Sequence, residues 1–274
     1  MKLSDYQPSA SRRILVYGAP KTGKTVLAGQ LASHFNLKYV GLENGANSLI
    51  TGVPKEFHKN IELIQIPDSR EFPIAIETCL KLFTGAAGTI CNKHGKWNCP
   101  LCAKTPEELT AIELNALTNK DILVLDSATQ LTNSCISHIC KGKADDYKMD
   151  YDDWRKLGTI LDRVFSQIQQ AGYNVIVISH ETMTEMVDGK MKIVPVAGTS
   201  NFSKTFAKYF DDVVYCEVVN KKHRFASSTG YAMNVISGSR SGVSIESEAV
   251  ASLLPLFGIP APAAVAVPAT AIKK

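Results

Sequence analysis

Residues 14–29 read ILVYGAPKTGKTVLAG, which sets a glycine-rich loop between an apolar run and a segment of helical periodicity. Residues 14–17 have the composition of a strand, and apolar residues recur at helical spacing across residues 25–35. The loop of residues 18–25 fits the pattern G-x-x-x-x-G-K-[ST], in the strand-to-helix context that this motif requires. We therefore expect a phosphate-binding site here, rather than a glycine turn that carries Lys and Thr by chance.

The residue types of this loop suit Mg-ATP. Backbone N–H groups freed by glycine surround phosphate oxygens, and a helix amino terminus adds partial positive charge. Lys24 would neutralise the β- and γ-phosphates, and the Thr25 hydroxyl would ligate Mg²⁺. The predicted nucleotide-binding residues of the loop are Gly18, Ala19, Pro20, Lys21, Thr22, Gly23, Lys24 and Thr25.

Two acidic residues close later strand-like runs. Asp126 ends the apolar run of residues 121–126 and is predicted to hold Mg²⁺ together with Thr25. The alternative is an ordinary strand-end acid that caps the next turn. Glu43 follows the strand predicted at residues 38–42, so it should emerge beside the phosphate loop and act as the general base. The alternative interpretation is that Glu43 is a solvated acid in a loop.

Strands alternate with helices along most of the chain, which predicts an α/β fold with a mainly parallel sheet and helices on both faces. Helices are predicted at residues 72–83, 106–117 and 152–170. Near the carboxyl terminus, residues 213–219 and 231–236 predict an antiparallel hairpin. We expect one domain, residues 1–258, with an insertion at about residues 88–105, followed by a flexible Pro- and Ala-rich tail at residues 259–274.

The insertion carries a metal-ligand pattern. Three thiols and one imidazole at Cys91, His94, Cys99 and Cys102 form two close pairs, which suits tetrahedral Zn²⁺. Four protein ligands close the coordination shell, so the predicted zinc is structural and braces the fold. The alternative is a contact with nucleic acid or a partner through Lys93, Lys96 and Trp97.

Composition sets only loose limits on function. The formal net charge is +4 and the isoelectric point about 8.6, which permits a nucleic-acid partner without requiring one. No apolar stretch has the length of a signal peptide or a membrane span, so we expect no membrane partner and a cytoplasmic location, in bacteria or in phage-infected cells.

The order of these residues resembles that of the RecA-like P-loop ATPases, over residues 14–242. The resemblance rests on Lys24, Glu43, Asp126-Ser127 and the polar run Ser179-His180-Glu181. Among RecA-like proteins it is greatest to the phage Sak-type single-strand annealing proteins. The resemblance implies that His180 senses the γ-phosphate, where RecA has glutamine, and that Arg240 reaches the ATP of a neighbouring subunit in a ring or filament. The alternatives are that His180 is a core histidine without this role and that Arg240 is a solvated surface arginine.

The resemblance also implies two DNA-contacting loops, at residues 140–148 and 183–203. Flexible lysine-bearing loops suit contact with the phosphates of single-stranded DNA, although the acidic residues of the first loop equally suit a solvated surface. We expect DNA-stimulated or assembly-stimulated ATP hydrolysis in recombination or strand annealing, with a single-strand-binding protein as a further candidate partner. The alternatives are a ring-type helicase core and an ATP-driven switch acting on proteins. The predicted DNA-binding residues are Lys141, Lys143, Lys148, Lys190, Lys192 and Lys204.

Overall fold

The computed structural model describes residues 11–261, except 187, 228–231, 233, 241, 244 and 248–251. Most of the predicted tail, residues 262–274, therefore lies outside the described residues. Ile259 is half-buried against the core of the domain, so the described end of the chain still packs on the body one residue beyond the predicted boundary.

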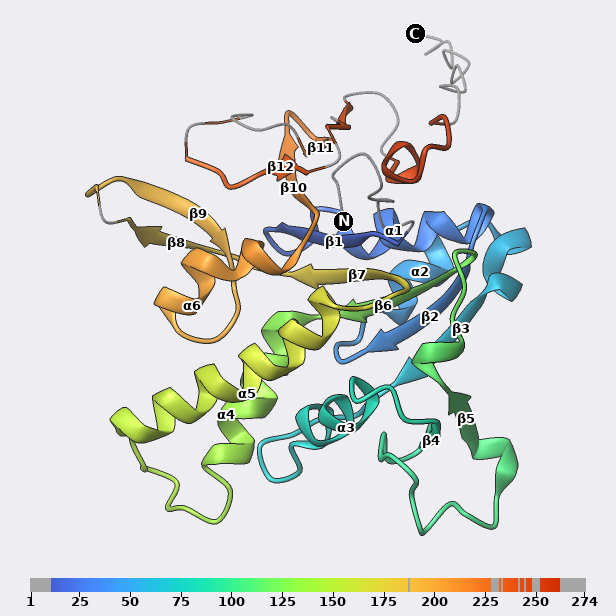
Figure 1. Cartoon of the computed structure of the whole chain (residues 1–274), viewed down its shortest axis with the longest axis vertical. Coiled ribbons are helices and arrows are strands. Elements are labelled where there is room, and N and C mark those ends of the chain that lie inside the picture. Colours follow the sequence, from blue (N-terminus) through green and yellow to red (C-terminus); the bar gives the residue numbers. More distant parts are fainter. Residues whose placement is uncertain are drawn as a thin grey trace, which may run out of the picture.

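A nine-stranded sheet forms the centre of the part of the chain that the structure describes (Figure 1). Its strand order is β13-β11-β10-β1-β7-β6-β2-β3, and β12 pairs with β10. The six strands from β10 to β3 run parallel; β11 and β12 pair antiparallel with β10, and β13 pairs antiparallel with β11. The strands are β1 (Arg13–Gly18), β2 (Asn36–Gly41), β3 (Ile61–Gln65), β6 (Asp121–Asp126), β7 (Asn174–Ser179), β10 (Asp212–Val219), β11 (Lys222–Ala226), β12 (Gly238–Ser239) and β13 (Glu246–Ser247).

The central strands β1, β6 and β7 are apolar between their end residues, as is typical of strands with helices on both faces of the sheet. Alternate residues of β1 belong to different cores: Leu15 and Tyr17 face one, whereas Ile14 and Val16 face the other. On the first face lie α3 (Ile74–Leu82), α4 (Ala128–Ile139), α5 (Tyr151–Gln169) and α6 (Ser200–Thr205); on the second lie α1 (Lys24–Gly29), α2 (Ala46–Gly52) and the 3-10 helix η2 (Gln30–Ser33).

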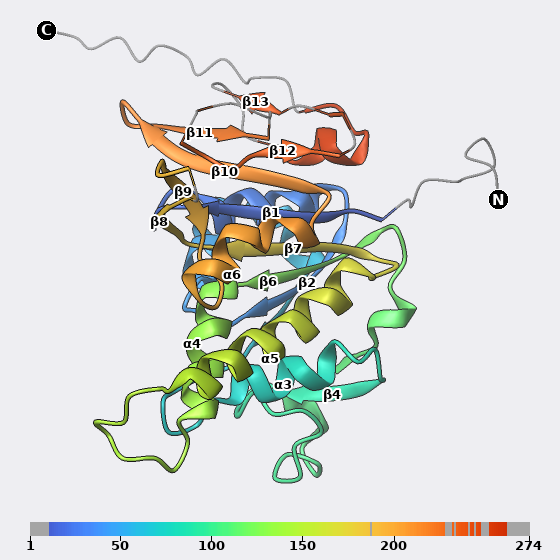
Figure 2. The ribbon, with the colours of Figure 1, turned by 60° about the vertical axis from the view of Figure 1, so that its left-hand side comes forward.

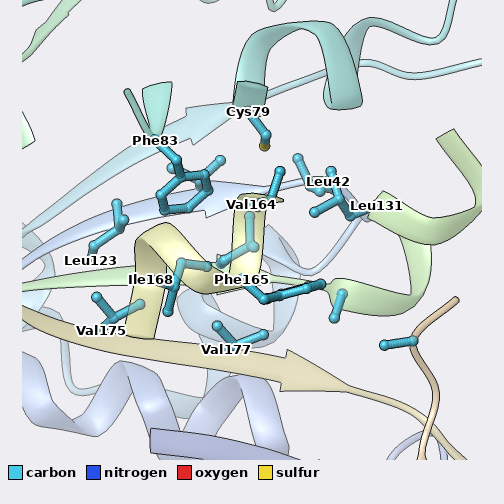
Figure 3. Packing of buried hydrophobic residues seen from close by; sticks show 14 of the residues in the cluster. Leu42, Cys79, Phe83, Leu123, Leu131, Val164, Phe165, Ile168, Val175 and Val177 are labelled. Carbon is cyan, nitrogen blue, oxygen red and sulfur yellow. The ribbon is translucent and has the colours of Figure 1, made fainter. Parts of the chain in front are cut away.

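Helix α5 shows how periodicity builds the first core. Its apolar residues recur every three to four positions, and Phe165 and Ile168 point toward Val175 and Val177 of β7 (Figure 3). The predicted α/β architecture with helices on both faces is confirmed. No helix of the described residues is long and apolar enough to cross a membrane.

The prediction of a helix at residues 106–117 is wrong. This segment forms η4 (Pro106–Glu108), the strand β5 (Leu109–Ile112) and η5 (Leu114–Ala116), and β5 pairs antiparallel with β4 (Gly88–Cys91). Thr110 and Ile112 are buried while Ala111 between them is exposed, which is the period of a strand. The pairing with β4, distant in sequence, overrides the local helical pattern.

Two further segments differ from expectation. The strand that forms a hairpin with β10 is β11, not residues 231–236, because Asn220 and Lys221 both have positive φ and close a tight hairpin turn. Residues 231 and 233 lie outside the described residues, and Val235 makes one isolated bridge to Ile193. The loop predicted at residues 183–203 is largely a second hairpin, β8 (Glu181–Glu185) with β9 (Met191–Pro195), which projects from the body at the left of Figure 1.

Three further 3-10 segments lie between or beyond these elements. They are η3 (Lys55–Asn60), η6 (Phe206–Tyr209) and η7 (Leu254–Phe257). The β4–β5 insertion lies at the end of the molecule away from β10–β13 in both views (Figures 1 and 2). The metal-ligand pattern and the carboxyl-terminal hairpin therefore occupy separate parts of the domain.

Candidate functional site

The phosphate loop follows β1, the strand that pairs with β10 on one side and β7 on the other. Gly18 has φ 154°, and a Cβ atom there would lie 2.0 Å from the Cys216 carbonyl oxygen, so only glycine fits. Gly23 has φ 89° and is the N-cap of α1. These two glycines explain why the loop can wrap closely before the helix begins.

Lys24 lies buried inside this loop. Its ammonium group donates to the carbonyl oxygens of Gly18 at 2.9 Å and Ala19 at 2.6 Å. Burial lowers the pKa of Lys24, because the charged form loses solvation, while the nearby carboxylates of Asp126 and Glu43 act against that shift. A buried cation held by the loop's own carbonyls is suited to an anionic ligand.

Asp126 ends β6 at the same edge of the sheet, and its carboxylate is buried. Its Oδ2 atom accepts hydrogen bonds from the Thr25 hydroxyl at 2.8 Å and from the Tyr39 hydroxyl at 2.5 Å. Burial raises the pKa of Asp126 because it penalises the ionised form. The adjacent hydroxyl and carboxylate oxygens fit the oxygen ligands that Mg²⁺ prefers, as predicted for Thr25 and Asp126. Tyr39 was not predicted, because its role depends on the pairing of β2 with β6.

Glu43 lies two residues beyond β2 and meets the residues that directly follow two other strands, β6 and β7. Ser127 Oγ donates to Glu43 Oε1, and His180 Nε2 lies 3.4 Å from Glu43 Oε2. The hydrogen bond from His180 lowers the pKa of Glu43, and burial acts in the opposite direction. The amide of Gln65 in β3 holds the Glu43 backbone carbonyl at 3.0 Å. The carboxylate is thus oriented by its neighbours, which a solvated loop acid would not be.

These residues line one cleft of about 630 Å³. Lys24, Thr25, Glu43, Asp126 and His180 all border it, although they come from four segments of the chain. They meet because the carboxyl ends of parallel strands lie at one edge of the sheet. Two further residues that line the cleft, His223 and Phe225 of β11, are not predicted from the sequence. The sequence feature that could indicate them is the alternation of the second hairpin strand, which was predicted at residues 231–236 instead.

Comparison with known proteins agrees with this geometry. A model of the AAA domain family matches residues 10–241, which include the loop and every residue of the cleft. The chain belongs to the AAA domain family. It is accordingly a P-loop ATPase domain, for which ATP and Mg²⁺ are the typical ligands. A search of curated proteins found no match.

Solved structures that are similar to this chain include the following two proteins. A KaiC-like protein from the archaeon Pyrococcus horikoshii is 13% identical, with a TM-score of 0.38 over 80% of this chain and 77% of that chain. An ATPase from the type III secretion system of pathogenic bacteria is 11% identical, with a TM-score of 0.44 over 77% of this chain and 53% of that chain.

The insertion of this AAA domain brings the four predicted zinc ligands together. His94 Nδ1 lies 3.7, 3.6 and 3.4 Å from the sulfur atoms of Cys91, Cys99 and Cys102. Zinc bonds of usual length at a tetrahedral angle imply an S···N separation of about 3.6 Å. The donor set therefore fits one Zn²⁺ ion, and the shell has no open position for a substrate.

The insertion is tied to the body of the AAA domain by its turn. Thr78 of α3 donates to the Gly95 carbonyl at 2.7 Å. Gly95 also packs against Ile66 and Pro67, which follow β3, so closely that a Cβ atom there would lie 2.7 Å from Ile66. These contacts agree with the prediction that the metal loop braces the fold.

Arg240 does not reach the phosphate loop of its own chain. It follows β12, which pairs with the first residues of β10, so it lies at the opposite edge of the sheet from Gly18. Its backbone N–H donates to Asp211 and its guanidinium to the Lys208 carbonyl at 3.1 Å. Within one chain, this side chain is therefore not part of the nucleotide cleft.

The predicted DNA lysines are dispersed over two regions. In the loop between α4 and α5, Lys143 is 2.8 Å from the buried Asp153 carboxylate and packs over the Tyr147 ring, so its charge is already paired. Lys141 pairs with Glu77, and Lys148 is exposed. Beyond β7, Lys190 pairs with Asp188, Lys192 lies on β9 and Lys204 on α6.

Proposed function

We propose that this AAA domain hydrolyses Mg-ATP in its cleft with Glu43 as general base. Lys24 and the loop N–H groups bind the phosphates; Thr25 and Asp126 would hold Mg²⁺, which would supply neutralisation of developing phosphate charge. Glu43 accepts the proton of the attacking water. Ser127 and His180 fix the two carboxylate oxygens, so the base is oriented before substrate arrives.

We further propose that hydrolysis serves the handling of single-stranded DNA in recombination or strand annealing, as in the Sak-type proteins. One observation supports this coupling. His180 touches Glu43 and is followed directly by the β8–β9 hairpin, which bears Lys190 and Lys192. DNA bound to that hairpin by its phosphate backbone would be connected to the proposed general base, Glu43, through one residue, His180. The hairpin is favoured over the α4–α5 loop, because Lys143 is held at 2.8 Å by the buried Asp153, whereas the pair of Lys190 with Asp188 is exposed and longer, at 3.6 Å.

The proposed working form is a homo-oligomer, a ring or a filament. Arg240 lies too far from its own loop to assist hydrolysis there, so its proposed role is to reach the ATP of the next subunit. A cation supplied in this way would make turnover depend on assembly.

The test is the rate of ATP hydrolysis with and without single-stranded DNA, at several salt concentrations. We expect the rate to rise with DNA, and DNA affinity to fall as salt rises with little sequence preference. Replacing Lys190 and Lys192 by alanine should weaken DNA binding and flatten its salt slope while nucleotide affinity is nearly unchanged. The matched control replaces the exposed Lys55 and Lys59 of η3, which carry the same charge.

Other outcomes would select the alternatives. Hydrolysis without salt-sensitive DNA binding would contradict the DNA proposal and indicate a switch that acts on proteins. Directional unwinding of a forked duplex would instead indicate a helicase motor. Equal losses in the double variant and its control would show that the hairpin is not the DNA contact.

A further inference from the structure

One wall of the nucleotide cleft is built by β11. Phe225 pairs with Cys216 of β10, and Cys216 pairs with Gly18, so Phe225 stands two strands from the start of the phosphate loop. Phe225 is buried, and its ring edge would lie 3.7 Å from a Cβ atom at Gly23. His223 is two residues earlier on the same face of the strand and is exposed. Both side chains border the cleft.

The His223 ring is held in place by two contacts. Its Nδ1 lies 3.0 Å from the Thr22 carbonyl oxygen, and since a carbonyl only accepts, Nδ1 must carry the proton. Its plane is nearly parallel to the Phe225 ring, at 17° with centroids 6.4 Å apart. One side of the imidazole therefore faces Phe225, and the hydrogen bond to Thr22 orients the exposed ring at the wall of the cleft.

The sheet order fixes which part of a nucleotide meets this wall. The phosphate loop follows β1, and Glu43 follows β2, which lies beyond β7 and β6 on one side. His223 lies on β11, beyond β10 on the other side. The γ-phosphate must face the general base, so the opposite end of the nucleotide must extend toward β11.

We propose that His223, backed by Phe225, is the platform on which the base of a bound purine nucleoside triphosphate stacks. The inference rests on the proposed nucleotide function and adds the part of the ligand that the loop motif does not specify. A fixed aromatic face binds a planar base by stacking, and a purine buries more of that face than a pyrimidine. His223 is thus a binding residue for the base and not for the phosphates.

Calorimetric titration separates base from phosphate binding, because inorganic tripolyphosphate carries the phosphates alone. With Mg²⁺ present, His223→Ala should weaken ATP binding about tenfold, or about 1.4 kcal/mol, and leave tripolyphosphate affinity unchanged. His223→Phe lacks the hydrogen bond to Thr22 but keeps a ring, so it should bind ATP within about twofold of the parent protein. Thermal denaturation of each variant checks that it folds.

The results that overturn the platform are specific. If His223→Ala lost ATP and tripolyphosphate binding equally, His223 would act by shaping the loop through Thr22. If His223→Phe bound ATP as poorly as His223→Ala, or if neither variant changed ATP affinity, stacking would also be excluded. Failure of the proposed nucleotide function would look different, since the parent protein would then bind neither ligand.

Discussion

Glu43 and His180 are the residues on which the proposed chemistry depends most. They lie 137 positions apart in the chain and make one hydrogen bond at 3.4 Å, which lowers the pKa of the carboxyl group. Ser127 holds the second carboxylate oxygen. A carboxylate kept ionised and oriented beside a phosphate loop is well placed to accept a proton from water.

Glu43→Gln should therefore separate binding from turnover. The amide occupies nearly the same space but cannot accept the water's proton, so we expect nucleotide affinity within a few-fold of the parent and turnover reduced by about 100-fold or more. Nucleotide titration and single-turnover hydrolysis measure the two effects. Unchanged turnover would show that Glu43 is a loop acid without a catalytic role.

The His180 hydrogen bond also predicts a pH dependence. Because it lowers the pKa of Glu43, the base form persists to lower pH than for an ordinary glutamate, and activity is lost only as pH falls through that lowered pKa. In His180→Ala, burial still raises the pKa of Glu43 without that opposing hydrogen bond, so the acid limb of the kcat profile should move to higher pH. His180→Gln keeps an N–H donor and should move it less. Identical acid limbs in all three proteins would contradict this role.

Among elements, the parallel strands were predictable and the paired insertion was not. Asp126 and Glu43 could be placed from the sequence, because each follows an apolar run and parallel strands end at one edge. Strand β5 was mistaken for a helix, since its partner β4 lies across the metal loop. The β11 wall of the cleft could not be predicted for a similar reason. His223 reaches the phosphate loop only because β11 pairs with β10, and the residues around His223 do not indicate that pairing.

The metal loop offers a test at the scale of an element. We expect about one zinc per chain, with Cys99→Ser lowering zinc content and reducing Tm by several degrees, since about 1 kcal/mol corresponds to roughly 2–4 °C for a chain of this size. Nucleotide affinity should change little, because no zinc ligand borders the cleft. Cys140→Ser, outside the cluster, is the control.

Metal analysis of protein purified without chelator decides this prediction first. If such protein contains no zinc, the prediction that the cluster holds a structural zinc is wrong, even though its geometry fits one. Equal effects of Cys99→Ser and Cys140→Ser on Tm would show that the cluster thiols have no special importance. Limited proteolysis should cut Cys99→Ser first within the insertion.

At the scale of the whole molecule, the sheet order assigns a direction to the nucleotide. The proposed general base, Glu43, lies on one side of the phosphate loop and the proposed base platform lies on the other. The lysine-bearing hairpin follows His180, which contacts Glu43. Arg240, at the opposite edge of the sheet from the loop, is the residue proposed to reach the nucleotide of a neighbouring copy. The sequence motifs identify the phosphate end of this arrangement, while the remainder depends on how the strands pair.

The most direct test of this account is the equilibrium affinity of the protein for Mg-ATP, measured by calorimetry for the parent, Lys24→Ala and Lys59→Ala. Lys24 is a buried cation inside the loop, whereas Lys59 is an exposed lysine on η3. We predict that Lys24→Ala raises the Kd about 100-fold or more with the fold retained, and that Lys59→Ala leaves it unchanged. Parent-like affinity in Lys24→Ala would contradict the assignment of this loop as the ATP site.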